Sequence, residues 1–307
     1  MTRRNLYFAF ATLVAMGLYW TPLKTLATSS LHSDVYPYTG LMPVLSACLI
    51  YLEKKRIFSR ARYDLGIGLV LLLLALIIRW STLKYGGALN PTDALSLLTL
   101  SFVVLWIGVF VLCYGAKALH AAAFQLSLLV LMVPLPPVFL EKSILVLRAG
   151  SAQVAGILFR LGGVPVFQNG FRLSLPITDL EVAEQCSGIR SGLSLFITSL
   201  LAGHLFLRTP LRKLCLVLAT FPITIFKNGL RIVTIYWLTI HPSMGSLVVW
   251  VHRYGGIPFS FLGLSLVALL VIILRKFEET SLGSWRIMAG SAQVRTKTSP
   301  PTLDLTC

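Results

Sequence analysis

The stretch Glu181-Val-Ala-Glu-Gln-Cys-Ser-Gly-Ile-Arg190 runs directly into the apolar run Leu193–Leu207. An apolar run entered from a polar segment predicts a helix that begins at a membrane surface. Cys186 then lies at the mouth of that helix, beside a cation and two acids. A partly hydrated thiol near a cation and near the positive end of a helix dipole favours the thiolate form. The sequence therefore marks Cys186 as a candidate nucleophile.

The composition is that of an integral membrane protein. Of the 307 residues, 56% are hydrophobic and 12% are charged, whereas a soluble domain carries about 25% charged residues. The net charge of +16 could suggest a nucleic-acid partner. The cations, however, punctuate apolar runs, which is typical of topology signals. We therefore expect the lipid bilayer, and no nucleic acid, as the partner of this chain.

The cysteines, histidines and acids show no metal-binding pattern. The five cysteines have no paired spacing, and the five histidines and eleven acids form no HExxH or EF-hand motif. We therefore expect no metal and no other cofactor. The apolar run that follows Arg3 and Arg4 lacks a convincing cleavage site, so we interpret it as a retained first helix.

The apolar runs predict an all-α integral membrane fold with about eight transmembrane helices. The expected spans cover residues 5–23, 36–52, 64–80, 94–114, 119–138, 188–207, 213–238 and 256–275. An even number of spans places both termini on one side, together with the majority of the 27 basic residues. The positive-inside rule then predicts cytoplasmic termini and a Cys186 that faces the extracytoplasmic side.

A small extracytoplasmic cap is expected between spans five and six, over residues 139–187. Residues 141–161 mix Leu, Val and Ile with charged residues and predict an amphipathic helix along the interface. Gly162-Gly163 should end this helix. Val164–Leu175 then alternates apolar and polar residues around Asn169-Gly170, which predicts a two-residue hairpin.

Two segments follow from this organisation. Residues 1–276 are expected to form one polytopic membrane domain. Residues 277–307 are rich in Ser, Thr and Pro and follow the basic pair Arg275-Lys276, and they predict a disordered cytoplasmic tail that contains Cys307.

Three side chains at the outer ends of different spans form a chemically sensible set. Asn228 and Arg231 share a helix face because they are spaced i, i+3, although an arginine there could also snorkel to the interface. His252 stands at the expected outer end of the last span, and His241 is placed equally well by topology. A thiolate nucleophile, an imidazole that moves protons and a guanidinium that stabilises an oxyanion would suit acyl transfer.

These residues resemble the motif set of the exosortase/archaeosortase family. The resemblance rests on Glu181–Arg190, on Asn228–Arg231, and on His252 followed by Gly256 and Phe259. It implies a membrane cysteine transpeptidase, classed with cysteine proteases among the hydrolases of peptide bonds, with Cys186, Arg231 and His252 as the catalytic trio. Arg253 stands where the family more often has an acid or a small polar residue, and the C-terminal tail is long, so the subfamily stays open.

The same resemblance implies the substrates and the location. Substrates would be exported proteins with a C-terminal sorting tail, made of a recognition motif (Pro-Glu-Pro in the PEP-CTERM class), a transmembrane helix and basic residues. The location would be a bacterial inner (plasma) membrane. The oligomeric state, the recognition motif and the acceptor stay open.

Five further residues receive supporting roles. The backbone N–H groups of Ser187 and Gly188 could help to hold the oxyanion. Arg190 could bind an acidic recognition residue or lower the thiol pKa, or serve as an interfacial anchor. Glu184 could orient His252, but solvation of the loop is the favoured role. Asn228 is expected to support Arg231.

Three other functions are compatible with the sequence. A transporter would use Lys227 and Arg231 along an anion path, but no duplicated half supports it. A membrane acyltransferase of an exopolysaccharide system would use His252 as its base, with Cys186 incidental. A scaffold subunit of such a system would need none of these side chains. Thiol chemistry separates these alternatives, because a cysteine enzyme alone depends on Cys186.

Overall fold

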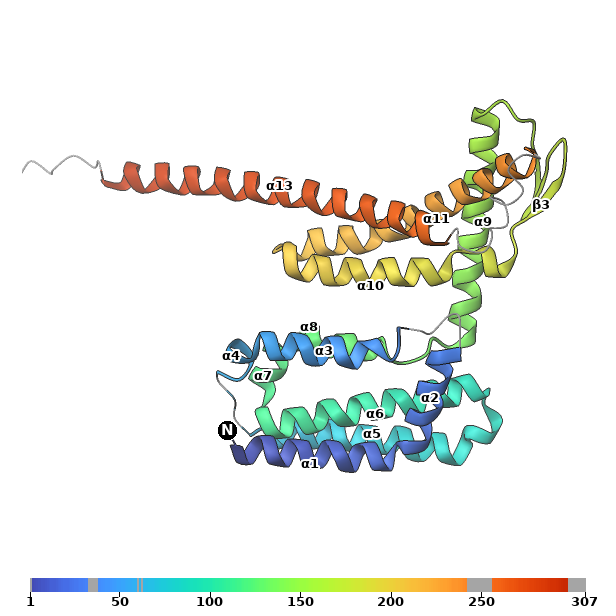
Figure 1. Cartoon of the computed structure of the whole chain (residues 1–307). Helices are drawn as coiled ribbons and strands as arrows, with labels where there is room; N and C mark the ends of the chain where they lie inside the picture. The colour runs from blue at the N-terminus through green and yellow to red at the C-terminus, as the bar shows by residue number, and fades with distance from the viewer. Residues whose placement is uncertain (1, 33–37, 60, 62, 242–255, 298–307) are drawn as a thin grey trace, which may run out of the picture. The chain divides into compact units, whose positions relative to one another are not determined.

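The structure is a computed structural model, and it describes all residues except 1, 33–37, 60, 62, 242–255 and 298–307. The described residues form helices and a small antiparallel sheet (Figure 1). They divide into two compact units, residues 1–145 and 146–307.

The first unit is a set of helices. They are α1 (Thr2–Leu18), α2 (Trp20–His32), α3 (Leu41–Leu52), α4 (Lys54–Ile57), α5 (Leu65–Tyr85), α6 (Pro91–Tyr114), α7 (Ala116–Ala121) and α8 (Ala123–Val130), with the short 3-10 helix η1 (Gly86–Ala88). Two glycines let α5 and α6 approach closely. A Cβ atom at Gly68 would lie 2.5 Å from Leu112 Cδ2, and one at Gly108 would lie 3.1 Å from Leu71 Cβ. Small residues at such contacts are typical of helix pairs in membranes.

The number of spans differs from the expected eight. The described residues hold six helices long and apolar enough to cross a membrane, or seven if α1 and α2, bent by 78°, count as one span. The expected span 36–52 contains α3, which has 12 residues. The expected span 119–138 is broken at Ala122 into α7 and α8, and α8 stops at Val130, shortly before the three prolines at 134, 136 and 137.

The helix expected along the interface is longer than the sequence suggested. It forms α9 (Pro137–Leu161), whose 25 residues and mean hydropathy of 1.5 are those of a membrane span. The helix gains Val138, Phe139 and Leu140 at its start, and these residues extend its apolar length. It ends where predicted, since Gly162 and Gly163 follow it and Gly163 has a φ of +73°.

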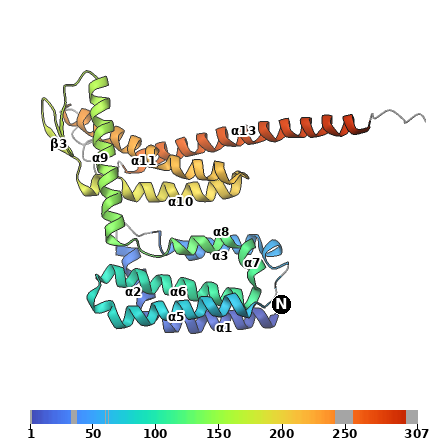
Figure 2. The same cartoon turned by 180° about the vertical axis from the view of Figure 1, so that it is seen from behind.

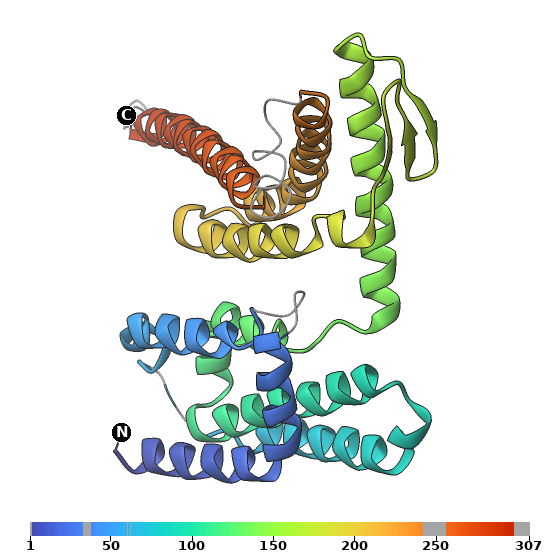
Figure 3. The same ribbon diagram turned by 45° about the vertical axis from the view of Figure 1, so that its right-hand side comes forward.

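The hairpin predicted around Asn169-Gly170 is confirmed. Strands β1 (Phe167–Asn169) and β2 (Arg172–Ser174) pair antiparallel, and Gly170 has a φ of +59° in the turn. A third strand, β3 (Asp179–Glu181), pairs with the other edge of β2 and was not predicted. The sheet lies beside α9 (Figure 3). Leu173 and Leu175 pack against Phe159 of α9 and against Tyr236 farther along the chain.

The rest of the second unit is a bundle of α10 (Ile189–Phe206), α11 (Pro210–Thr239) and α13 (Gly256–Lys297), seen from behind in Figure 2. Their shared core contains Leu195, Leu216 and Val267. The buried carboxylate of Glu278 accepts hydrogen bonds from the backbone N–H groups of Arg208 and Thr209, and so fixes the α10–α11 turn to α13.

The C-terminal segment differs from the disordered tail expected from residue 277. The structure describes α13 as a helix through Lys297. The first prolines after Pro258 stand at 300 and 301, so the backbone of residues 259–297 carries every N–H that a helix needs. Cys307 lies outside the described residues.

Candidate active site

Cys186 lies in a tight turn between the sheet and α10. It ends the 3-10 helix η2 (Glu184–Cys186), in which Cys186 N donates to Ala183 O at 2.9 Å and Ser187 N donates to Glu184 O at 3.0 Å. Gly188 then caps α10 with a φ of +80°, a conformation that residues with a side chain rarely adopt. The Cys-Ser-Gly order thus lets the chain turn directly from η2 into a helix.

Asn228 holds this turn from α11. Its side-chain amide donates to the Cys186 carbonyl at 2.7 Å and to Ser151 Oγ of α9 at 3.0 Å. A Cβ atom at Gly188 would lie 3.3 Å from the Asn228 side-chain carbon Cγ. Asn228 is 4% exposed, and a buried amide needs such partners because losing them costs about 1–3 kcal/mol.

Glycine also explains how α11 comes so close to α9. A Cβ atom at Gly229 would lie 2.6 Å from Val154 Cγ1, and one at Gly150 would lie 2.8 Å from Ile225 Cδ1. The two helices therefore cross with little space between their backbones. This crossing brings Asn228 within reach of Ser151.

Lys227 supports the same turn from the neighbouring position. Its Nζ donates to Ser191 Oγ at 2.5 Å, and Ser191 Oγ donates to Gly188 O at 3.1 Å. Lys227 is 3% exposed, and a Cβ atom at Gly263 of α13 would lie 3.0 Å from its Cδ. The side chain is thus enclosed by α10 and α13, which is not how a residue lining an anion path would lie.

Arg148 of α9 holds the segment that leads from β3 to Cys186. Its Nε donates to Val182 O at 2.8 Å, and its guanidinium carbon lies 4.1 Å from the centre of the Phe171 ring. Its terminal nitrogens lie 3.9 Å from Glu181 Oε1 and 3.6 Å from Glu184 Oε1. Sequence reasoning missed this role. The available signal was a lone cation in the middle of residues 141–161.

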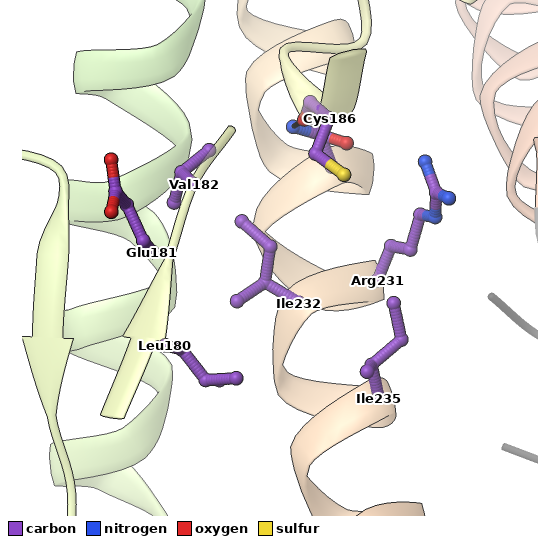
Figure 4. A pocket seen from close by; sticks show the side chains of 8 residues that line it. Leu180, Glu181, Val182, Cys186, Arg231, Ile232 and Ile235 are labelled. Atoms are coloured by element: carbon purple, nitrogen blue, oxygen red, sulfur yellow. Dashed lines mark hydrogen bonds between the residues drawn. The ribbon is translucent and has the colours of Figure 1, made fainter. Parts of the chain in front are cut away.

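A pocket opens beside the turn, and Figure 4 shows its lining side chains. It is lined by Leu180, Glu181, Val182, Cys186, Asn228, Arg231, Ile232 and Ile235. Arg231 projects from α11, and its guanidinium lies on the side that the Cys186 sulfur faces (Figure 4). The rest of the lining is mostly aliphatic. A thiol and a guanidinium therefore share one mostly apolar pocket.

The structure brings together three of the predicted site residues, Cys186, Asn228 and Arg231. His252 lies outside the described residues. The competing His241 follows α11, where its Nδ1 lies 2.7 Å from Trp237 O, and its side chain is exposed. Cysteine and arginine thus meet although 45 residues separate them in the sequence.

Comparison with known proteins decides the family. The family model for the transmembrane exosortase EpsH matches residues 7–272, which include every residue that lines the pocket. The chain belongs to the transmembrane exosortase family. The resemblance seen in the sequence is thereby confirmed. Membership implies a sorting protease or transpeptidase in a multi-pass membrane protein, acting on substrates with sorting signals.

No curated protein and no solved structure matches this exosortase. Its supporting residues are therefore assessed from their own contacts. Ser187 is fully buried, and its N–H already donates to Glu184 O, so it is not open to a substrate oxygen in this conformation. Glu184 is exposed and lies beside Arg148, as a loop residue would. Arg190 is exposed in the first turn of α10.

Proposed function

We propose that this exosortase is a membrane cysteine peptidase or transpeptidase that removes PEP-CTERM-like C-terminal sorting signals from exported proteins. The observation that carries the proposal is the shared pocket of Cys186 and Arg231. Asn228 fixes the carbonyl of Cys186 beside it, so the backbone that bears the nucleophile is held by a buried hydrogen bond. Positioned nucleophiles of this kind lower the entropic cost of attack.

The first step would be attack by the Cys186 thiolate on a backbone carbonyl of the substrate. A bond forms between sulfur and the carbonyl carbon, and the oxygen takes up the negative charge. Arg231 would stabilise this oxyanion, and the N–H of Gly188 is the remaining backbone candidate after Ser187. The aliphatic lining of the pocket strengthens such electrostatic stabilisation because it excludes water.

The second step would release the sorting tail and leave a thioester on Cys186. The carbon–nitrogen bond breaks as His252 gives a proton to the leaving amine. An amine acceptor or water, activated by His252, then attacks the thioester and restores the thiolate. The first acceptor gives transpeptidation and the second gives proteolysis. No cofactor is needed for either outcome.

The charge distribution of the second unit supports an active site that faces away from the cytoplasm. A group of basic residues lies at the end of the bundle opposite Cys186. They belong to the α10–α11 turn and the start of α11, and to the place in α13 where its apolar run stops: Arg208, Arg212, Lys213, Arg275 and Lys276. The positive-inside rule assigns this end to the cytoplasm. The end of the α13 span that carries Arg275 and Lys276 would then be cytoplasmic, with Arg190 near the outer surface as a candidate contact for an acidic recognition residue.

The experiment is a size assay of a tagged substrate with a C-terminal sorting tail in cells that express this protein. We expect wild type and the control Cys307→Ala to remove the tail. Cys186→Ala, Arg231→Ala and His252→Ala should retain it, and His241→Ala should process it. Processing by Cys186→Ala would show that the nucleophile is another residue.

A further inference from the structure

Strand β3 is an edge strand whose outer side borders the pocket. The sheet order is β1-β2-β3, so within the described residues no strand pairs with the side of β3 that faces away from β2. Three residues of the strand segment, Leu180, Glu181 and Val182, line the pocket together with Cys186. An edge strand presents backbone N–H and C=O groups that another extended chain can use.

The register shows which backbone groups point outward. Val182 N donates to Phe171 O of the β2 side at 3.0 Å, and Leu180 is paired with Leu173. Because alternate residues of an antiparallel strand face the partner, the N–H and C=O of Glu181 must face away from β2. The two outward groups of Glu181 are thus a ready donor and acceptor at the border of the pocket.

Across the pocket, α11 supplies an apolar wall. Ile232 of α11 points toward the β3 segment, whereas Ile235 lies on the side of the helix that carries Arg231 (Figure 4). Cys186 lies at one end of the space between the strand and the helix, and its sulfur points toward the side of α11 that carries Arg231. A segment that entered this space along β3 would therefore lead to the thiol.

We propose that the substrate segment binds as an extended strand on the outer edge of β3, with its backbone hydrogen-bonded to Glu181. The inference rests on the proposed function, and it deepens it by naming how the peptide is held. A peptide backbone matches the donor and acceptor of Glu181, whereas a lipid chain supplies neither. Strand addition also leaves alternate side chains of the substrate for the aliphatic wall.

The β3 segment that would receive the peptide is held at a fixed position relative to Cys186. Arg148 donates to Val182 O, directly after Glu181, and its guanidinium also lies 3.6 Å from Glu184 in the turn of Cys186. The hydrogen bond to Val182 O thus ties the strand edge to α9, and Cys186 follows four residues later. A backbone placed on β3 would be placed relative to Cys186 at the same time.

The first test compares Glu181→Pro with Glu181→Ala. Both lose the carboxylate and its contact with Arg148, but only proline loses the outward N–H. Proline is tolerated at edge positions whose N–H makes no ladder bond. We expect kcat/KM for tail removal to be about five- to tenfold lower in the proline variant than in the alanine variant. The loss should appear in KM, and the rate of Cys186 alkylation by a small reagent should be equal in the two variants.

Equal KM values for the two variants would overturn the proposal while leaving tail removal by wild type, and so the proposed function, intact. If proline instead slows Cys186 alkylation, the turn itself has been damaged. The proposal is then tested with modified substrate peptides and the wild-type protein. Peptides that span the cut site found with wild type would then carry one N-methyl amide each. If the peptide binds as an added strand, N-methylation of every second amide should abolish inhibition, and N-methylation of the amides between them should not. A loss of inhibition that does not alternate along the peptide would exclude strand addition.

Discussion

At the residue scale, Gly188 and Asn228 together set the geometry of Cys186. The positive φ of Gly188 lets η2 pass into α10, and the missing Cβ leaves room for the Asn228 side chain. Asn228 in turn uses both hydrogens of its amide, on Cys186 O and on Ser151 Oγ. Its expected role was to support Arg231. The contacts show that it supports the backbone of the candidate nucleophile directly.

Asn228→Asp should therefore abolish processing. An aspartate would place a second acceptor against the Cys186 carbonyl oxygen, which would lose its donor. The unsatisfied, buried carbonyl and carboxylate would cost about 1–3 kcal/mol or more. Initial rates of tail removal and of Cys186 alkylation measure the effect. Ser151→Ala is the matched control, because it removes one of the two acceptors and should lower the rate much less. Equal losses in both variants would contradict a direct role of Asn228 at Cys186.

Gly188→Ala should also reduce processing strongly. The alanine has to adopt a φ near +80° and its Cβ would press on Asn228, so strain of about 1 kcal/mol adds to a steric conflict. Gly163→Ala is matched to it, since Gly163 has a φ of +73° but no atom within 4 Å of its Cβ position. Comparing thermal stability and processing rate of the two variants separates backbone strain from the contact. If Gly163→Ala lost as much activity, the contact with Asn228 would be irrelevant.

At the element scale, α9 acts as the support of the site. Arg148, Ser151 and Val154 recur at i, i+3 along one face and contact, in order, the β3 segment, Asn228 and Gly229. The helix expected to lie along the interface therefore holds in place the segments that line the pocket. Its length, from Pro137 to Leu161, lets one face serve the Cys186 turn, the sheet and α11.

Arg148→Met should uncouple the Cys186 turn from α9. Methionine can fill part of the space beside Phe171, but it cannot donate to Val182 O, which leaves a buried carbonyl unsatisfied. We expect a processing rate roughly tenfold lower. Arg160→Met, at the exposed end of the same helix, should keep the wild-type rate. The ion pairs with Glu181 and Glu184 contribute little, since both glutamates are about 70% exposed.

A double variant, Glu181→Gln with Glu184→Gln, checks that last point. It removes both ion pairs of Arg148 but leaves its hydrogen bond to Val182 O in place. Processing close to that of wild type would assign the effect of Arg148→Met to the lost hydrogen bond. A rate as low as that of Arg148→Met would assign it to the charges.

At the scale of the whole molecule, the orientation in the membrane follows from the two ends of the α10–α11–α13 bundle. Cys186 lies at one end, and Lys213 lies in the first turn of α11, at the other. In a protein whose other four cysteines are replaced by alanine, an impermeant maleimide added to intact cells should label Cys186 and block processing. Lys213→Cys combined with Cys186→Ala should be labelled only after the cells are opened. The opposite pattern would invert the proposed topology.

The sequence by itself determined the membrane class, the family, the hairpin at Asn169-Gly170 and the residues of the Cys186 motif. These features are local, because hydropathy, a positive φ at glycine and a short motif depend on neighbouring residues. It overestimated the continuity of the helices at 36–52 and 119–138, where apolar composition gave no measure of where a helix stops.

Only the tertiary structure decided the third strand, the role of Arg148 and the hydrogen bond from Asn228 to Cys186. The last two depend on contacts between residues far apart in the chain, because 34 positions separate Arg148 from Val182 and 42 separate Cys186 from Asn228. Strand β3 has three residues, which are too few for an alternation of apolar and polar side chains to predict a strand. They pair because β2 offers a free edge. Packing of α11 against α9 through Gly229 then brings the cysteine turn and the arginine to one pocket.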